Sequence, residues 1–276
     1  MGVSETLLLN KRFNLFPQMG IVERSDMATG ALLEGKVIVL IEGSVLALVA
    51  PKLFFEFFIS SDDLYDDKFI AILGKYVRMY STFLSVTMTA LYVAILSFHI
   101  DTLPGDFIFT IYDSNQGVPF SIAIGALIIE LVVEMLREAL LRVPKQIGAA
   151  VGIVGGIVIG QAAIAAKIFS PLLLIVVSIS LLSSFTAPDY TIMNSLRIIK
   201  FFLIIASSFF GLIGFSLAIS IVLIDMISTN TFGIPYLTPF TPFNWHDFKN
   251  VFLYGKDISF LRPKFLRTKD KTRFKK

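Results

Sequence analysis

The chain has 276 residues, of which 55% are hydrophobic and only 16% charged, a balance that predicts a protein dissolved largely in lipid. The absence of cysteine excludes disulfides, cysteine-ligated zinc and iron–sulfur clusters. The net charge of +3 conceals a basic tail, because nine of the 24 Lys and Arg residues lie between Lys256 and Lys276.

The first 74 residues are more polar than the rest and contain one clear local unit. Two runs rich in β-branched residues, Val37–Ile41 and Val45–Ala50, flank Glu42-Gly43-Ser44 and predict a β-hairpin. A hairpin is not stable alone, so we expect a small cytosolic α/β remnant of a larger domain. Gly30–Lys36 fits the start of a P-loop, but Val37 replaces the hydroxyl that should reach Mg²⁺. This fragment therefore predicts a turn before a strand and not a nucleotide site.

Aromatic residues and aspartates alternate in the next segment, residues 52–78. The pattern of "KLFFEFFISSDDLYDDKF" predicts a surface helix, then an Asp-rich N-terminus of the following helix. A calcium loop is disfavoured, because alternating oxygen ligands around a central glycine are missing.

The first predicted membrane span is Met79–Phe98, an uncharged run long enough to cross the hydrocarbon core. Lys75 and Arg78 precede it and place its N-terminal end in the cytoplasm by the positive-inside rule. No Lys or Arg occurs from Met79 through Leu136. We therefore expect the following loop, which carries several aspartates, on the outer side.

A second apolar run, Val118–Val143, leads back to the cytoplasm and contains charged residues. Glu130, Glu134, Arg137 and Glu138 lie at helical offsets that allow pairing along one stripe. Ionisable groups inside a membrane usually mark function. An ion-pathway or subunit-contact role and a purely structural role both remain open for this stripe.

The third run, Ile147–Ala166, is unusually rich in glycine. Small residues let helices approach closely in lipid, where no hydrophobic force drives association. The stripe predicts either ordinary helix packing or a helix whose copies surround a pore axis, and Val or Ile constrictions can gate such a pore. The residues of this predicted packing or pore-axis site are Gly148, Gly152, Gly155, Gly156, Val158, Gly160 and Gln161.

Two further apolar runs follow, Pro171–Phe185 and Phe201–Ile224. Five simple crossings would place the basic tail outside, against the positive-inside rule. One run therefore does not cross simply: either the short fourth one, or a re-entrant fifth one broken at Gly211 and Gly214. The sequence predicts an α-helical integral membrane protein with about 4–6 membrane segments and both termini in the cytoplasm.

Three regions result: a cytosolic remnant at 1–74, a polytopic membrane domain at 75–228 and an interfacial and basic segment at 229–276. The proline-rich stretch "FGIPYLTPFTPFNW" cannot form a regular helix and is predicted to lie along the membrane interface, with Tyr236 and Trp245 at that level. The basic tail suits anionic lipids better than nucleic acid.

Several long strings resemble the GerA family, the A subunits of spore nutrient-germinant receptors. They are "EFFISSDDLYDD", "LYVAILSFHIDTLP", "QGVPF", "EMLREALLRVPKQIGAAVGIVGGIVIGQAAIAAKIFSP" and "SSFTAP", and the similarity runs from about Glu23 to about Pro242. Family members carry a larger cytosolic N-terminal region, so this chain looks N-terminally shortened.

The resemblance implies a subunit of the inner spore membrane that works with a transporter-like B subunit and a lipoprotein C subunit. It also implies an oligomeric, ligand-gated ion channel that triggers germination, with the glycine-rich helix near the axis. A GerA-family accessory or non-conducting scaffold remains the alternative. No catalytic motif, metal site or cofactor is predicted, and the isolated His99 reads as an interfacial residue beside Asp101.

Overall fold

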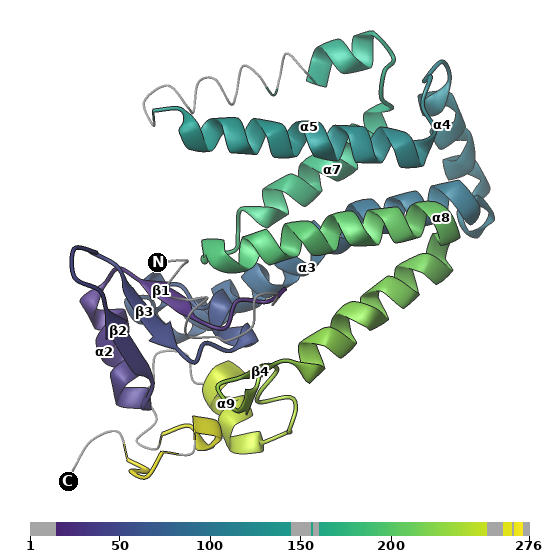
Figure 1. The fold of residues 1–276 in the computed structure, drawn as a ribbon. Helices are drawn as coiled ribbons and strands as arrows, with labels where there is room; N and C mark the ends of the chain where they lie inside the picture. The colour runs from purple at the N-terminus through teal and green to yellow at the C-terminus, as the bar shows by residue number, and fades with distance from the viewer. Residues whose placement is uncertain (1–14, 145–155, 157–159, 253–261, 267, 273–276) are drawn as a thin grey trace. The chain divides into compact units, whose positions relative to one another are not determined.

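The computed structural model describes residues 15–144, 156, 160–252, 262–266 and 268–272, and most of them are helical (Figure 1). The helices are α2 (Ser25–Glu34), α3 (Lys68–Phe98), α4 (Gly105–Asn115), α5 (Ile122–Arg142), α7 (Pro171–Ser184), α8 (Tyr190–Ser228) and α9 (Trp245–Phe252). The strands are β1 (Gly20–Val22), β2 (Val37–Leu40), β3 (Ala47–Ala50), β4 (Asn230–Thr231) and β5 (Ile234–Pro235). Short 3₁₀ helices occupy Phe54–Phe58, Asp62–Leu64, Ile100–Thr102 and Lys264–Leu266.

The chain divides into two compact units. Unit 1 comprises Met1–Ser81, Thr186–Leu196 and Ile221–Lys276. Unit 2 comprises Thr82–Phe185 and Arg197–Ser220. The long helices α3 and α8 each contribute residues to both units.

Unit 1 contains a three-stranded antiparallel sheet in the order β1-β3-β2. Val37 of β2 lies opposite Ala50 of β3, and Leu40 lies opposite Ala47, so the predicted hairpin is confirmed. The third strand, β1, was not predicted, because three residues are too few to show a strand period. All four residues of the central strand β3 are buried.

The P-loop-like fragment lies at the end of helix α2. The helix ends at Gly35, whose φ of 96° only glycine adopts easily and whose N–H donates to the carbonyls of Ala31 and Leu32. The Lys36 ammonium is paired with Glu34 at 3.0 Å and Glu56 at 2.8 Å. Burial lowers the pKa of Lys36, but the two carboxylates outweigh it and raise the pKa above its usual value. A strand, β2, follows directly, as predicted.

Two predictions about the aromatic residues of unit 1 are wrong. The segment predicted as a surface helix is the 3₁₀ helix Phe54–Phe58, and its Phe55, Phe57 and Phe58 are buried. Tyr236 does not present its ring to a membrane interface: the residue is fully buried, with its ring centroid 5.7 Å from that of Phe16. Burial also raises the pKa of Tyr236. Aromatic spacing alone did not distinguish a packed core from an exposed face.

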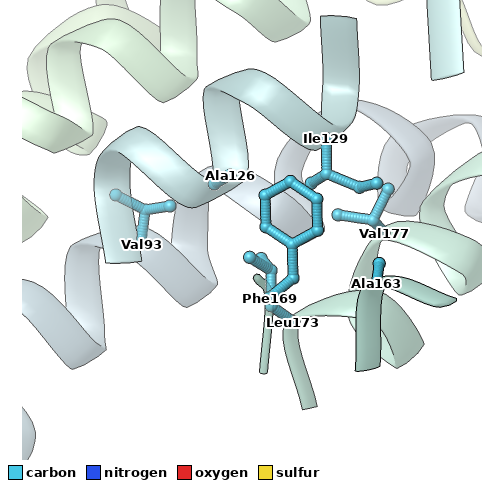
Figure 2. Packing of buried hydrophobic residues seen from close by; sticks show 7 residues of the cluster. All are labelled: Val93, Ala126, Ile129, Ala163, Phe169, Leu173 and Val177. Atoms are coloured by element: carbon cyan, nitrogen blue, oxygen red, sulfur yellow. The ribbon is translucent and has the colours of Figure 1, made fainter. Parts of the chain in front are cut away.

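The core of unit 2 joins α3, α5 and α7 (Figure 2). In Figure 2 the ring of Phe169 lies between Ile129 of α5 and Leu173 of α7. Helix α7 begins with Ser170 as N-cap, whose hydroxyl accepts from the N–H of Leu173, and Pro171 occupies the first turn. The cluster consists of Val93, Ala126, Ile129, Ala163, Phe169, Leu173 and Val177.

The predicted apolar runs correspond to helices wherever the structure describes them. Among the residues that the structure describes, two helices, α3 and α8, are by length and composition apolar enough to cross a membrane. Helix α5 has 21 residues but includes the charged stripe, and α7 is shorter, at 14 residues. The loop after α3 contains a helix that was not predicted, α4.

Helix α8 is broken at Gly211. There φ is 59° and ψ is −137°, a combination that belongs to no helix and essentially only to glycine. Figure 1 shows α8 as two arms that meet at this point. The arms approach closely, because a Cβ on Gly214 would lie 2.1 Å from the carbonyl oxygen of Ala206. Of the two glycines at which a break of the fifth run was considered, Gly211 is where the helix breaks.

Both ends of α8 are anchored to one short segment of unit 1. Lys52 forms an ion pair with Asp189, which also caps the start of α8 by accepting from the N–H of Thr191. At the other end, Tyr236 donates its N–H to the carbonyl of Thr229, and its own carbonyl accepts from the N–H of Phe54. A straight helix of 39 residues would separate these ends by about 58 Å.

Candidate functional site

The least exposed charge of unit 2 is Glu130, in the middle of α5. Its side chain is only 3% exposed, and both of its carboxylate oxygens have a partner. Oε1 accepts a hydrogen bond of 2.7 Å from the hydroxyl of Thr89 on α3. Oε2 lies 2.7 Å from the ammonium of Lys200 on α8. One carboxylate therefore joins three helices.

A second ion pair lies one turn further along α5. Glu134 Oε1 is 2.9 Å from Arg197 of α8, and Oε2 is 3.7 Å from Arg137 of α5 itself. Arg137 also donates to the hydroxyl of Ser184 at the end of α7, at 3.1 Å, and lies over the ring of Phe185. We call the set Glu130, Glu134, Arg137, Arg197 and Lys200, with Thr89 and Ser184, the charge network.

The network lies deep in the apolar layer that α3 defines. Thr89 is ten residues after Met79 and nine before Phe98, the ends of the uncharged run. At 1.5 Å per residue this places the hydroxyl about 15 Å from either end, near the middle of a span. Glu130 is thus paired inside the protein, with Thr89 and Lys200.

Pairing explains how these charges remain in a low-dielectric interior. Burying an ion without a partner is very unfavourable, whereas a pair with further hydrogen bonds is tolerated. The network has three cationic and two anionic groups, and Nε of Arg137 and Nε of Arg197 have no acceptor in the described part of the chain. Buried polar clusters of this kind fix helix register in some proteins.

Three of the four residues of the predicted stripe belong to the network. Glu130, Glu134 and Arg137 are brought together with partners from other helices. Glu138 does not join it: Glu138 forms an exposed ion pair of 2.7 Å with Arg142 on the same helix. No group of three or more His, Asp or Glu side chains suited to a metal ion occurs among the residues that the structure describes.

Sequence reasoning missed the partners Thr89, Arg197 and Lys200. None of the three was assigned a role from the sequence. A signal was present, since two acids spaced by four residues lie in one apolar run and two bases spaced by three residues directly precede another, Phe201–Ile224. Matching charges between separate runs would have suggested the pairs, although not the hydroxyl.

The predicted glycine-rich site is described only in part. Gly148, Gly152, Gly155 and Val158 lie outside the described residues. A Cβ built on Gly156 or Gly160 would have nothing within 4 Å among the residues that are described, and Gln161 is exposed. Ala163, by contrast, is buried in the core of unit 2. The two described glycines therefore do not serve packing against the described part of their own chain.

The tip of α8 meets the far end of α3. A Cβ on Gly211 would lie 2.9 Å from both Cβ of Phe98 and Cε1 of His99. His99, predicted as an interfacial residue, ends that run and has its Nδ1 3.4 Å from the carbonyl oxygen of Ala94.

Comparison with known proteins gives one family and several relatives. The model of the family described as Bacillus/Clostridium GerA spore germination protein matches residues 2–262. Spore germination protein GerLA of Bacillus cereus is 37% identical over 98% of this chain and 55% of its own length. Spore germination protein KA of Bacillus subtilis is 37% identical over 99% of this chain and 50% of its own length.

A third relative carries no germination name. The uncharacterized membrane protein YfkQ of Bacillus subtilis is 33% identical over 91% of this chain and 49% of its own length. The chain thus spans about half the length of the curated relatives it matches. No solved structure matches the chain.

Proposed function

The chain belongs to the GerA family of spore germination proteins, and from that premise we propose that it acts as the membrane part of an A subunit of a nutrient-germinant receptor. The observation that carries the proposal is the match over nearly the whole chain, together with relatives named as spore germination proteins. The family consists of receptor subunits and not of enzymes.

The finer proposal is that copies of the chain form an ion channel that opens when nutrient binds. Two features support it. Gly156 is exposed, and a Cβ on Gly156 or Gly160 would meet nothing within 4 Å among the described residues, which leaves room for a second helix backbone, as association in lipid requires. The charge network places ionisable groups at mid-depth, where they are rare and usually functional.

The receptor is proposed to include a transporter-like B subunit, which holds the nutrient, and a lipoprotein C subunit. Nutrient binding at a partner then has to reach this chain through its helices. The network suits that task, because a shift of α8 against α5 breaks the Lys200–Glu130 pair and leaves an unpaired charge. Two discrete arrangements, paired and open, make a switch.

The proposed location is the inner spore membrane with both termini in the cytoplasm. Lys75 and Arg78 mark the cytoplasmic end of α3. If α3, α5, the glycine-rich run and α7 cross once each, the two arms of α8 cross out and back. The total is six segments, at the upper end of the predicted range, and the even number keeps the basic tail inside.

The experiment combines crosslinking with ion flux, and the cysteine-free chain makes it direct. Gly156→Cys or Gly160→Cys is introduced, the protein is reconstituted with its B and C partners, and disulfide-linked dimers are sought on oxidation. Thr102→Cys, an exposed loop position, is the matched control. We expect crosslinks for the glycine positions and nutrient-dependent release of K⁺ from the vesicles. Crosslinks without flux contradict the channel, and the absence of both contradicts the whole proposal.

The scaffold alternative makes a different prediction for Val158. In a channel, Val158→Glu near the axis alters flux and germination. In a non-conducting scaffold, the same substitution leaves germination normal while the oligomer persists. A germination assay of spores that carry the variant therefore separates the two.

A further inference from the structure

A cluster of exposed aromatic side chains surrounds the start of α9. Phe243 and Trp245 are 62% and 56% exposed, and Phe240 is 46% exposed. All three contact the half-buried ring of Phe248. The distances between ring centroids are 5.4 Å for Phe240, 5.8 Å for Phe243 and 5.6 Å for Trp245. We call Phe240, Phe243 and Trp245 the aromatic patch.

The patch is the outer side of a layered arrangement. Phe248 stacks on Phe252 at 4.8 Å, and Phe252 is buried against Phe55, at 5.1 Å. The inner rings therefore belong to the core of unit 1, and the outer rings are held rigidly by them. Exposed aromatic rings that are fixed from behind form a contiguous apolar surface, which usually marks an interaction site.

A basic group lies within the patch. The ammonium of Lys249 is 5.2 Å from the centroid of the Trp245 ring, within range of a cation–π contact. Rings with a neighbouring lysine match the interfacial layer of a bilayer, where aromatic residues lie at headgroup level and lysine contacts phosphate.

The position of α9 along α3 supplies the decisive step. Phe252 contacts Tyr76 of α3 at 6.3 Å, and Lys75 of α3 donates to the carbonyl of Val251. These α3 residues precede Met79, the start of the uncharged run, by three and four positions. That separation is about 5 Å along the axis, so α9 is attached where α3 enters the apolar layer.

We propose that the aromatic patch inserts into the headgroup and upper acyl layer of an anionic phospholipid bilayer. The patch acts as a depth anchor that fixes the level of α3 relative to the membrane surface. The proposal concerns lipid binding and does not require that the protein conduct ions. A protein partner on the same surface is the competing occupant that the test excludes.

The experiment uses Trp245, the only tryptophan of the chain. The full chain is reconstituted in vesicles of phosphatidylcholine and phosphatidylglycerol, with the phosphatidylcholine brominated near the carbonyl end or near the end of its acyl chains. We expect about twofold quenching of Trp245 fluorescence by the shallow bromines, less by the deep ones, and little by aqueous iodide. Quenching by iodide and not by bromolipid overturns the proposal. Protection from both also overturns it, because protein then covers the patch.

Variants test the two parts of the surface separately. Phe243→Ser, at an exposed position that leaves the inner rings in place, should reduce bromolipid quenching about twofold. Lys249→Gln should make the quenching independent of phosphatidylglycerol. Val45→Ser removes an even more exposed apolar side chain of unit 1, one outside the patch, and should change nothing. If Val45→Ser and Phe243→Ser have the same effect, the patch has no special role.

Discussion

The two long helices of this chain, α3 and α8, satisfy the same test for a membrane span and yet differ in structure. Helix α3 is continuous over 31 residues, and half of its most apolar stretch is buried within the protein. Helix α8 has 39 residues, folds back at Gly211, and has only 22% of its most apolar stretch buried. Length and hydropathy predict that a segment enters the membrane, whereas one glycine decides on which side it leaves.

The two helices also use their polar residues differently. Thr89 of α3 joins Glu130 through a neutral donor, while Lys200 of α8 joins the same carboxylate through an ion pair. Helix α8 buries less apolar surface, so a larger share of its attachment to unit 2 depends on charge. The comparison predicts that single substitutions in α8 lower the free energy of unfolding more than single substitutions in α3.

The largest effect is expected for Lys200→Met. Removal of the cation leaves Glu130 buried and unpaired, which should reduce the free energy of unfolding by about 3–5 kcal/mol. Thermal unfolding in detergent measures the change. The double variant Lys200→Met/Glu130→Met should recover most of this loss, because an apolar pair replaces an ion pair well. A double variant no more stable than the single one refutes the pairing.

The second largest effect is expected for Gly211→Ala, which should reduce the free energy of unfolding by about 2–4 kcal/mol. The alanine must adopt a backbone conformation that is nearly restricted to glycine, and its Cβ collides with Phe98 and His99. The unfolding midpoint should fall, and the ends of α8 should separate. An unchanged midpoint contradicts the fold-back at this residue.

Thr89→Val tests the weaker attachment of α3. The substitution removes one hydrogen bond to the Glu130 carboxylate, which keeps its ion pair with Lys200. The free energy of unfolding should therefore fall by about 1.5–3 kcal/mol. Val has nearly the same shape, and the packing of α3 is preserved. A loss as large as that of Lys200→Met contradicts the difference between the two helices, and the same unfolding assay measures it.

The smallest effect is predicted for Gly74→Ala, the matched control for Gly211→Ala. Gly74 lies inside the unbroken α3, and an added Cβ would lie 3.2 Å from Nη1 of Arg78, a side-chain contact that can adjust by a few tenths of an ångström. Higher helix propensity should stabilise the chain by up to about 1 kcal/mol. If Gly74→Ala destabilises the chain as much as Gly211→Ala, any glycine replacement is harmful. The effect of Gly211→Ala would then not be evidence for a special backbone conformation at that residue.

Local patterns in the sequence predicted the elements of this fold better than their contacts. The hairpin of β2 and β3 follows from β-branched runs around a turn, and the break of α8 follows from glycines that interrupt an apolar run. Tyr236 was placed at an interface because aromatic rings suit both interfaces and cores. Its burial depends on Phe16, more than 200 positions away, and no local period records such a contact.

The charge network shows the same limit. The spacing on α5 predicted that Glu130, Glu134 and Arg137 share a face, and they do. Their partners on α8 lie about 60 positions later, and only the register of two packed helices selects them. Glu138 has the correct spacing but lies on the exposed side with Arg142, because the stripe leaves the packed region before it ends.

Membrane topology tests the central claim, the fold-back of α8, most directly. Single cysteines at Asn194, Ser228 and Thr102, all exposed, are labelled in sealed vesicles with a membrane-impermeant maleimide. The account predicts that Asn194→Cys and Ser228→Cys react from one side and Thr102→Cys from the other. Reaction of Ser228→Cys from the side of Thr102→Cys would mean that α8 crosses as a single helix, in contradiction to the account.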